Sequence, residues 1–403
     1  MCQQTELTTL FSLGDQCLTG VFPRSKDQVI SHGPVDLVRC SHPRGCGLVQ
    51  LRQSYSLDEM YGDNYGYRSG LNISMVNHLK NKVKKILDMN LLREGDLVID
   101  IGSNDATTLR NYPQGMYTLA GVDPTGGKFR EYYNDDICLI PEFFSSDAIK
   151  NVFPHRPAKV ITSFSMFYDL EDPIAFAQQI EEILDPNGVW IFEQSYLPMM
   201  LSTNSFDTIC HEHLEFYALK QLMWITQSAN LKIVDLEIND VNGGSISIVA
   251  AKKSSRLQRN EVLIQETLRS ESELGVSDGS AFLLFNDRVK IAKEEMLGFL
   301  YRAKAAGKTV AGLGASTKGN VLLQYYNITT DLVAKIGEVN SDKIGYYTPG
   351  SLIPMVWEDD LLAENPDYIL VLPWHFREFF INLDSLKGRT LVFPLPSLEI
   401  LHL

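Results

Sequence analysis

The stretch LVIDIGSNDATTL, residues 97–109, decides the fold of this chain. Its first five residues are mostly apolar and lead directly into Gly102 and a series of short polar side chains. Such a pattern is typical of a buried parallel strand that ends in a loop and the N-terminus of a helix. We therefore predict a strand–loop–helix unit whose loop backbone can approach a ligand closely.

Similar apolar runs recur on the C-terminal side, and a helical pattern separates two of them. Alternating strands and helices predict an α/β fold, a doubly wound sheet that extends to about residue 250. The segments assigned to this sheet are MYTLAGVDP (116–124), AKVITSF (158–164), GVWIFEQ (188–194), LKIVDLEI (231–238) and SISIVAAKK (245–253), with the helical IAFAQQIEEIL (174–184) between the second and third.

Other parts of the chain have different patterns. The first 55 residues are rich in Gly, Pro and Ser with short apolar runs, which predicts a β-rich module too small for a strong core. Residues 71–92 carry apolar positions at helical spacing, and at residue 308 the strand-to-loop pattern starts again in a second, smaller α/β unit. We predict four segments: an N-terminal module (1–60), the main α/β domain (61–253), a helical connector (254–300) and a C-terminal α/β domain (301–403).

Length and charge limit the possible functions. The 403 residues predict two or three domains, and 36 Lys and Arg against 50 Asp and Glu give a net charge of -14. This balance argues against nucleic acid or anionic lipid as partners, because both need clustered positive charge. No apolar run reaches the ~18 residues of a membrane helix, and the N-terminus has no secretory pattern. We therefore expect a cytoplasmic protein.

Four of the six cysteines fall within the first 46 residues: Cys2, Cys17, Cys40 and Cys46. Six cysteines are too few for a disulfide framework in a chain of this length. In a reducing compartment, clustered thiols are typical of metal ligands, and a metal would stabilise a small module. The sequence thus predicts a metal site near the N-terminus.

A ligand site is predicted where the first strands of the main domain end. Asp100 ends the first strand, Gly102 follows it, and Asp123 ends the next strand, where an acid can accept both hydroxyls of a ribose. The G-x-G-x-x-G spacing that cradles a pyrophosphate is absent. S-adenosylmethionine (SAM) has no phosphate, so a SAM site fits better than a nicotinamide site. A plain turn with a solvated acidic loop is the alternative.

The segment NSFDTICHEHLEFYAL (204–219) is the most unusual in the chain. His211 and His213 flank Glu212, and this spacing differs from the H-E-x-x-H of zinc proteases. One interpretation is acid–base catalysis, because histidine has a pKa near ~6.5 that a carboxylate partner can tune. The others are a metal site and a buried, hydrogen-bonded histidine pair.

Several motifs in a fixed order make the chain recognisable. It resembles the nucleotide-sugar C-methyltransferase family, whose members methylate keto-deoxysugars, over nearly its whole length. The resemblance implies a class I SAM-dependent methyltransferase domain with a Rossmann-like fold, an N-terminal zinc-binding module and a C-terminal Rossmann-like α/β domain that helps to bind the sugar nucleotide. The motifs are CSHPRGCGLVQL (40–51), MYGDNYGYRSGLN (60–72), LVIDIGSNDATTL (97–109), GVDPT (121–125), SFSMFYDLEDP (163–173), GVWIFEQSYLPMMLSTNSFDTICHEHLEFY (188–217), NGGSISIVA (242–250), GLGASTKGN (312–320) and EVNSDKIGYYTPGSLIP (338–354).

The chemistry that the resemblance implies is carbon methylation through an enolate. A 4-keto group acidifies the neighbouring C–H, and a general base removes that proton. By similarity, His213 would be the base, Glu212 its partner or a sugar ligand, and Tyr65 and Tyr67 would flank the sugar. Cys210 stands where some relatives carry an aromatic residue, which puts the sugar contact at this position in question.

The resemblance also implies which residues bind SAM. Gly102, Asn104 and Asp105 would lie under the ligand, with Asp123 on its ribose and Asp100 at the end of the strand. Ala106 stands where relatives usually carry Gly. The adenine and methionine neighbours would be Pro124, Phe144, Ser163 and Met166.

The zinc module departs from the family pattern. Cys40 and Cys46 form the second cysteine pair, whereas Cys2 matches the second member of the first pair, whose partner would precede residue 1. We infer that the chain begins late or that the site has three thiolates. Cys17 or His42 could then be the fourth ligand, because zinc accepts Cys₃His sites. The alternative is a metal-free module.

The remaining substrate contacts are expected from both α/β domains. Lys318 in GLGASTKGN lies at a predicted helix N-terminus and could bind the diphosphate of the substrate. Three other enzyme or binding functions stay open: O- or N-methylation of a small metabolite, a nicotinamide oxidoreductase, and a non-catalytic binding protein. We expect a nucleotide-sugar substrate and a monomer or homodimer. Further candidate substrate contacts are His211, Cys210, Asn242, Ser245, His375 and Arg377.

Overall fold

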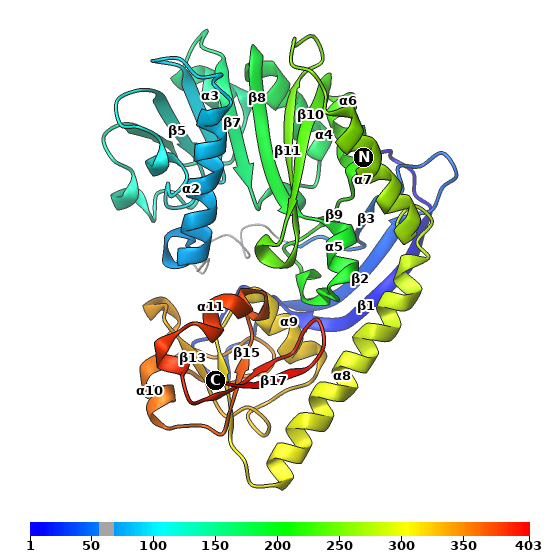
Figure 1. The fold of residues 1–403 in the computed structure, drawn as a ribbon, viewed down its shortest axis with the longest axis vertical. Coiled ribbons are helices and arrows are strands. Elements are labelled where there is room, and N and C mark those ends of the chain that lie inside the picture. The colour runs from blue at the N-terminus through cyan, green and yellow to red at the C-terminus, as the bar shows by residue number, and fades with distance from the viewer. Residues whose placement is uncertain (56–67) are drawn as a thin grey trace.

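The stretch 97–109 contains an interior strand, β4, of a seven-stranded sheet in the computed structural model, which describes residues 1–55 and 68–403 (Figure 1). The strand order is β10-β11-β8-β7-β4-β5-β6, and β11 alone runs antiparallel to its neighbours. All five residues of β4 are buried, as the apolar run predicts. The strands are β4 (Leu97–Ile101), β5 (Thr118–Val122), β6 (Ile137–Ile140), β7 (Ala158–Phe164), β8 (Leu184–Ser195), β10 (Leu231–Asn239) and β11 (Ser245–Lys252).

Helices cover both faces of this sheet. The helix α2 packs its buried Val83 and Ile86 against Val98 and Val160 on one face. The other face is covered by α3, α4 and α6, which share a core with Trp190 and other strand residues. The helices of this domain are α2 (Ile73–Asp88), α3 (Ser146–Val152), α4 (Pro173–Ile183), α5 (Leu197–Ser202) and α6 (Leu219–Ser228).

The first 55 residues form the predicted β-rich module, with one addition from the main domain. Its four-stranded sheet has the order β1-β2-β3-β9, and all pairs are antiparallel. The strand β9 comes from the segment that directly follows His213. The strands are β1 (Leu7–Cys17), β2 (His32–Cys40), β3 (Val49–Leu51) and β9 (Glu215–Phe216).

The C-terminal unit contains a six-stranded sheet in the order β14-β13-β12-β15-β16-β17, parallel except for β17. The predicted connector consists of α7 and the long α8, which extends beyond the expected boundary at residue 300. The elements are α7 (Glu261–Leu274), α8 (Ala281–Ala305), β12 (Val310–Leu313), α9 (Thr317–Tyr325), β13 (Ile336–Glu338), β14 (Met355–Trp357), α10 (Glu358–Ala363), β15 (Tyr368–Val371), α11 (Arg377–Ile381), β16 (Thr390–Phe393) and β17 (Glu399–His402).

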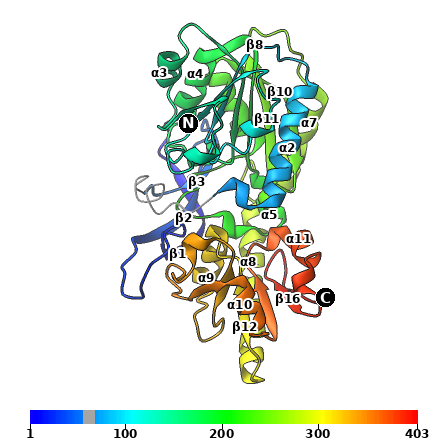
Figure 2. The same cartoon turned by 90° about the vertical axis from the view of Figure 1, so that its left-hand side faces the viewer.

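The N-terminal sheet lies beside the seam between the two larger units (Figure 2). One continuous hydrophobic core joins its Val35 and Leu37 to Phe285 of α8 and to Leu322 of α9. The same core includes Leu197 and Leu201 of α5, so all three units of the chain contribute to the seam. Short 3₁₀ turns complete the chain: η1 (Ser69–Leu71), η2 (Leu109–Asn111), η3 (Arg130–Tyr132), η4 (Phe167–Asp169), η5 (Phe206–Thr208), η6 (Val241–Gly243), η7 (Ser341–Lys343), η8 (Trp374–Phe376) and η9 (Asp384–Leu386).

Candidate active site

The loop after β4 turns sharply at the edge of the sheet. Gly102 has a left-handed φ of 72°, and a Cβ added there would lie 3.1 Å from Cγ of Met166. Asn104 and Ala106 also have positive φ, at 48° and 58°. Ala106 is fully buried in a conformation that glycine adopts without strain, which explains why glycine suits this position in relatives.

A cavity of about 330 Å³ opens over this loop, at the point where β4 lies between β5 and β7. This is the topological switch point, where ligands bind in open α/β sheets. The carboxylates of Asp100, Asp123, Asp169 and Glu171 line the cavity, and among the described residues no lysine or arginine does so. The cavity therefore suits a ligand that carries positive charge and no phosphate, as SAM does.

The two predicted acids have different roles in the cavity wall. The carboxylate of Asp123 accepts hydrogen bonds from the backbone N–H of Asn104 at 2.8 Å and of Thr125 at 2.7 Å. It thus orders the loop, and its oxygens have further lone pairs for ribose hydroxyls. Burial raises the pKa of Asp100 to about 7, although Thr162 donates a hydrogen bond of 2.6 Å to its carboxyl group.

Most residues predicted to bind SAM lie at this cavity, and two do not. Asp105 instead accepts hydrogen bonds from the backbone N–H of Gly70 at 3.0 Å and from Nε of Arg68 at 3.2 Å. Ser163 accepts a hydrogen bond from the indole N–H of Trp190 at 3.0 Å. The predicted residues that line the cavity are Asp100, Gly102, Asn104, Asp123, Pro124, Phe144 and Met166.

Sequence reasoning missed other residues in the wall. The motif SFSMFYDLEDP contained a usable signal, because its last acids follow a strand end on the same edge of the sheet as β4. The signal for Met75 and Leu79 was their place on the apolar face of a predicted helix, where core packing was the simpler interpretation. Lining residues not predicted include Ser69, Met75, Leu79, Thr107, Thr108, Phe143, Asp169, Leu170 and Glu171.

His213 is held in one tautomer beside the cavity wall. Its Nδ1 lies 2.7 Å from the carbonyl oxygen of Thr208, so Nδ1–H donates and Nε2 is the basic nitrogen. The ring packs edge-on against Tyr168, at 4.3 Å between centroids, and Tyr168 directly precedes the wall residue Asp169. Desolvation and the Lys318 charge lower the pKa of His213 to about 4, so the ring is neutral at physiological pH.

Glu212 does not orient the ring of His213, contrary to the prediction. Its carboxylate accepts a hydrogen bond from the thiol of Cys210 at 3.5 Å and lies against the backbone of Gly20 in the N-terminal module. Burial raises its pKa to about 7. The orienting partner of His213 is the Thr208 carbonyl, and this partner has no side-chain signal in the sequence.

His211 and Cys210 are both buried, and both form hydrogen bonds within the protein. His211 is fully buried, with Nε2 3.4 Å from the carbonyl oxygen of Gly33 and its ring edge-on to Tyr55. The buried, hydrogen-bonded interpretation therefore fits this histidine. Burial also raises the pKa of the Cys210 thiol well above its ordinary value, so this thiol stays protonated.

Charged and polar groups from both α/β domains meet next to His213. The ammonium of Lys318, in the first turn of α9, donates to the carbonyl oxygen of Asn242. Asp207 accepts a hydrogen bond from the indole of Trp374 at 2.8 Å, and its second oxygen is buried without a partner among the described residues. Burial lowers the pKa of Lys318, and the negative charge of Asp207 opposes this shift. The seam thus contains a partly buried cation and a carboxylate oxygen that has no hydrogen-bond partner among the described residues.

Three of the other candidate contacts also lie at the seam. Asn242 donates to the hydroxyl of Ser165 in the cavity wall at 3.5 Å, and Nδ1 of His375 is buried without a hydrogen-bond partner among the described residues. The hydroxyl of Ser245 donates to the Val241 carbonyl. Arg377 does not reach the seam cluster but pairs with Glu399 through two bonds of 2.8 Å. Tyr65 and Tyr67 lie outside the described residues.

The predicted thiol cluster is present in the N-terminal module. The sulfur atoms of Cys2, Cys40 and Cys46 all lie within 4.8 Å of one another, and Cys2 and Cys40 are separated by 3.6 Å. Zinc bound to thiolates at about 2.3 Å separates neighbouring sulfurs by about 3.8 Å, so the three side chains fit a zinc ion. Desolvation by itself would raise the pKa of the Cys2 thiol. Hydrogen bonds from Gln4 and Cys46 outweigh this effect and lower the pKa to about 7.

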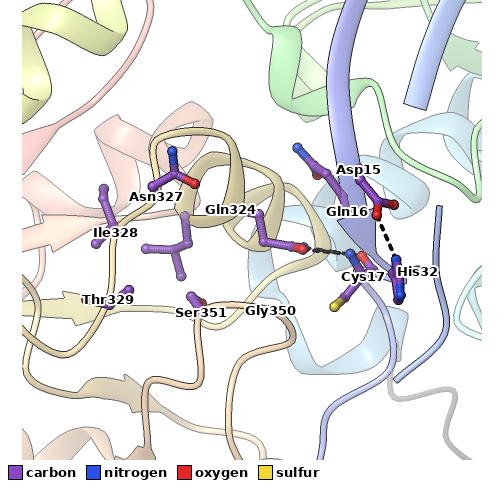
Figure 3. A pocket seen from close by; sticks show the side chains of 11 residues that line it. Asp15, Gln16, Cys17, His32, Gln324, Asn327, Ile328, Thr329, Gly350 and Ser351 are labelled. Atoms are coloured by element: carbon purple, nitrogen blue, oxygen red, sulfur yellow. Dashed lines mark hydrogen bonds and ion pairs between the residues drawn. The ribbon is translucent and has the colours of Figure 1, made fainter. Parts of the chain in front are cut away.

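Neither proposed fourth ligand belongs to this cluster in the parts of the chain that the structure describes. Cys17 lies at the end of β1 beside a different cavity of about 320 Å³, where its backbone N–H donates to Gln324 at 2.8 Å (Figure 3). His42 accepts a hydrogen bond from the Arg44 backbone at 3.1 Å. The prediction of Cys17 as a ligand is therefore wrong, because Cys17 lies at the other end of β1 from the cluster, whereas His42 as a fourth ligand stays a prediction.

Comparisons with known proteins match the division of the chain into three units. Three family models match consecutive parts of the chain: "Putative zinc binding domain" (residues 1–61), "Methyltransferase domain" (75–236) and "C-methyltransferase C-terminal domain" (240–396). The C-methyltransferase NovU from Streptomyces niveus is 28% identical over 408 residues, which cover 100% of this chain and 96% of NovU.

Solved structures resemble part of the chain. A complex of the Trm112 methyltransferase activator with a methyltransferase from Haloferax volcanii has 17% identity and a TM-score of 0.35, and covers 44% of this chain and 94% of that chain. Magnesium protoporphyrin IX methyltransferase from Synechocystis PCC 6803, with bound S-adenosylhomocysteine, has 12% identity and a TM-score of 0.34, and covers 45% and 88%.

The fold, the acidic cavity whose described lining contains no lysine or arginine, and the family matches define a SAM-dependent methyltransferase of class I. The cavity over the β4 loop is the candidate cofactor site, and the N-terminal module carries a zinc-type cysteine cluster. The matches to NovU and to the C-methyltransferase model support C-methylation as its activity. Every helix in the described parts of the chain is too short or too polar to cross a membrane.

Proposed function

We propose that this C-methyltransferase acts on a nucleotide-linked 4-keto-deoxysugar and that His213 generates the enolate. The observation that carries the proposal is a neutral histidine in a defined tautomer beside the SAM cavity. The resemblance to nucleotide-sugar C-methyltransferases supports the keto-sugar as substrate. The seam between two α/β domains supports a substrate larger than a simple metabolite, because groups from both domains meet there.

The proposed reaction uses His213 as a general base. Its Nε2 accepts a proton from the carbon next to the ketone, and the electron pair of that C–H bond forms the enolate. The Thr208 carbonyl holds the ring in the tautomer that can accept this proton and stabilises the imidazolium that forms. When bound, SAM supplies an electrophilic methyl group for the nucleophilic carbon.

The residues proposed to bind SAM act through shape and charge. Gly102 allows the backbone to approach the ligand, and Asp123 accepts the ribose hydroxyls. Phe144 and Met166 supply apolar surface. At the seam, the Lys318 ammonium is proposed to bind the diphosphate of the substrate, with Asn242 and His375 beside it.

Two measurements test this proposal. The purified protein is incubated with SAM and a panel of nucleotide-linked keto-sugars, and products are analysed by mass spectrometry and NMR for a new C–CH₃ group. In parallel, the same sugars are incubated in heavy water without SAM. We expect deuterium at the carbon next to the ketone. A product with a methoxy group and no deuterium uptake would contradict the proposal and favour O-methylation.

A further inference from the structure

The segment that carries His213 is attached to the N-terminal sheet at several points. The backbone N–H of Leu51 donates to the carbonyl oxygen of Leu214 at 2.8 Å. The next two residues form β9, in which Glu215 pairs with Gln50 and Phe216 with Val49. The chain on the C-terminal side of His213 is therefore the fourth strand of the N-terminal sheet.

The chain on the other side of His213 is attached to the same module. Nε2 of His211 lies 3.4 Å from the Gly33 carbonyl in β2, and its ring contacts Tyr55. The Glu212 carboxylate lies against Gly20. His213 thus sits in a short segment with contacts to the N-terminal module before and after it.

The three thiols close the opposite end of these strands. Cys40 ends β2, and Cys46 lies three residues before β3. The backbone N–H of Cys40 donates to the Leu48 carbonyl at 2.9 Å, and Gln221 of α6 donates to the Cys46 carbonyl at 2.9 Å. The cluster therefore joins β2, β3 and a helix of the methyltransferase domain at one point, and Cys2 brings in the chain that leads to β1.

We propose that the three-thiol metal site positions the catalytic base: by locking β2 and β3 in register, it sets where β9 and therefore His213 lie relative to the SAM cavity. This inference rests on the proposed role of His213. The residues between β2 and β3, 41–48, form no helix or strand, and a metal ion bound to Cys40 and Cys46 adds a constraint at this end of the two strands. The residues of β2, β3 and β9 that connect the metal site to His213 are positioning residues, because they act through His213 and contact no reacting atom.

The decisive experiment compares zinc-loaded protein with protein depleted by a chelator, both followed by amide hydrogen exchange and metal analysis. Without zinc, we expect amide exchange in residues 208–217 and 49–51 to accelerate by about ten-fold or more, because local opening becomes easier. SAM affinity measured by calorimetry should change less than about two-fold, because the SAM cavity shares no residue with the module. Turnover number should fall while the KM for SAM stays constant.

Variants distinguish the effect of the metal from the effect of the contacts that connect the N-terminal module to the His213 segment. Cys46→Ser should reproduce zinc loss, and Cys138→Ser, a cysteine of β6 outside the cluster, is the matched control that should retain zinc and slow exchange. His211→Phe should keep its zinc but accelerate exchange only in 208–217, because it loses the bond to Gly33. Unchanged exchange in 208–217 after zinc loss would overturn the inference. Absence of any turnover with keto-sugars would instead count against the proposed function, because the exchange measurement needs no substrate.

Discussion

At the residue scale, two histidines of the same motif have different environments. The His211 ring is fully buried and bound to the N-terminal module, whereas the His213 ring is fixed by a main-chain carbonyl and packs on Tyr168, which precedes the cavity-lining residue Asp169. The difference arises because the segment between η5 and β9 is irregular, so residues two apart need not share a face. Of the two, His213 is the one whose tautomer is fixed and whose ring lies close to the cavity lining, which is why we propose it as the base.

Replacement of His213 should abolish most of the activity. In His213→Asn, we expect methyl transfer to fall by about 10³-fold, within the range of lost general-base catalysis, because no basic nitrogen remains. SAM affinity should stay the same, since His213 does not line the cavity. Steady-state kinetics and calorimetry measure the two effects. His155→Asn, in an exposed turn, is the control, and equal rates for both variants would remove His213 as the base.

The buried Glu212 predicts a pH-dependent stability. Its pKa is raised to about 7 in the folded protein, above the ordinary value, so the folded state binds more protons between these two values. Stability from this group is therefore present at low pH and lost as pH rises towards about 7. In Glu212→Gln this loss, on the order of 3 kcal/mol, should disappear.

Thermal melting at pH 5 and pH 8 tests this expectation. The Tm of Glu212→Gln should fall less between the two pH values than that of the parent protein. Glu294→Gln, at an exposed position of α8, should behave like the parent. The same pH dependence in Glu212→Gln and in the parent would show that the buried carboxyl group is not its origin.

At the scale of elements, the SAM cavity depends on how β4 passes into its loop. The strand is fully buried, and the chain then turns through three left-handed residues at Gly102, Asn104 and Ala106. Asp123, at the end of the neighbouring β5, fixes this turn through the Asn104 amide. At Gly102 the turn presents backbone without a side chain to the cavity, where we propose that SAM binds.

Substitution of Gly102 should weaken SAM binding. In Gly102→Ala, the added Cβ would meet Met166 at 3.1 Å in a left-handed backbone, so the loop must shift. We expect the Kd for SAM to rise by about ten-fold or more, as for the loss of ~1.4 kcal/mol, with a loss of stability of about 1 kcal/mol. Calorimetry and thermal melting provide the two values.

Gly95→Ala is the matched control for this substitution. Gly95 also has a left-handed φ, of 81°, but a Cβ there would meet no atom within 4 Å, and Gly95 is outside the cavity. Gly95→Ala should therefore lose as much stability through backbone strain as Gly102→Ala, but its affinity for SAM should not change. Equal effects of both variants on the Kd would contradict the role of close approach at Gly102.

At the scale of the whole molecule, the site is complete only because two α/β domains face each other. The C-terminal domain brings Lys318, Trp374 and His375 to the segment that carries His213. The N-terminal sheet holds the same segment from another side through β9. Under the proposed function, substrate recognition and methyl transfer depend on how the three units pack together.

Loss of the seam cation should mainly weaken substrate binding. In Lys318→Met, the side chain keeps its length but loses its charge, so the KM for the nucleotide-sugar should rise by about ten-fold or more, as for loss of a buried charge-assisted contact. The KM for SAM should not change. Lys335→Met, which removes a surface pair with Glu364 on the same domain, is the control for steady-state kinetics. A fall in kcat without a change in KM would instead place Lys318 at the reacting atoms.

Local patterns predicted much of this architecture. The apolar runs predicted β4, β5, β7, β8, β10 and β11, because buried strands have a simple local signal. The loop chemistry predicted a ligand site at the end of β4, and most of the residues expected to bind SAM line the cavity found there, although they are a minority of its lining. Asp105 and Ser163 do not line the cavity. Asp105 instead accepts hydrogen bonds from Arg68 and Gly70, which are distant in sequence, and Ser163 accepts one from Trp190 in another strand.

The sequence by itself determined the fold class, the SAM site at the end of β4 and the thiol cluster, because these depend on local apolar runs, short loops and residue type. Only the tertiary structure decided the partner of His213, the structural roles of Glu212 and His211, and the exclusion of Cys17 from the metal site. These features depend on main-chain carbonyls and on β9 joining the N-terminal sheet. Such contacts join residues far apart in the chain and involve groups that every residue carries, so no local pattern records them.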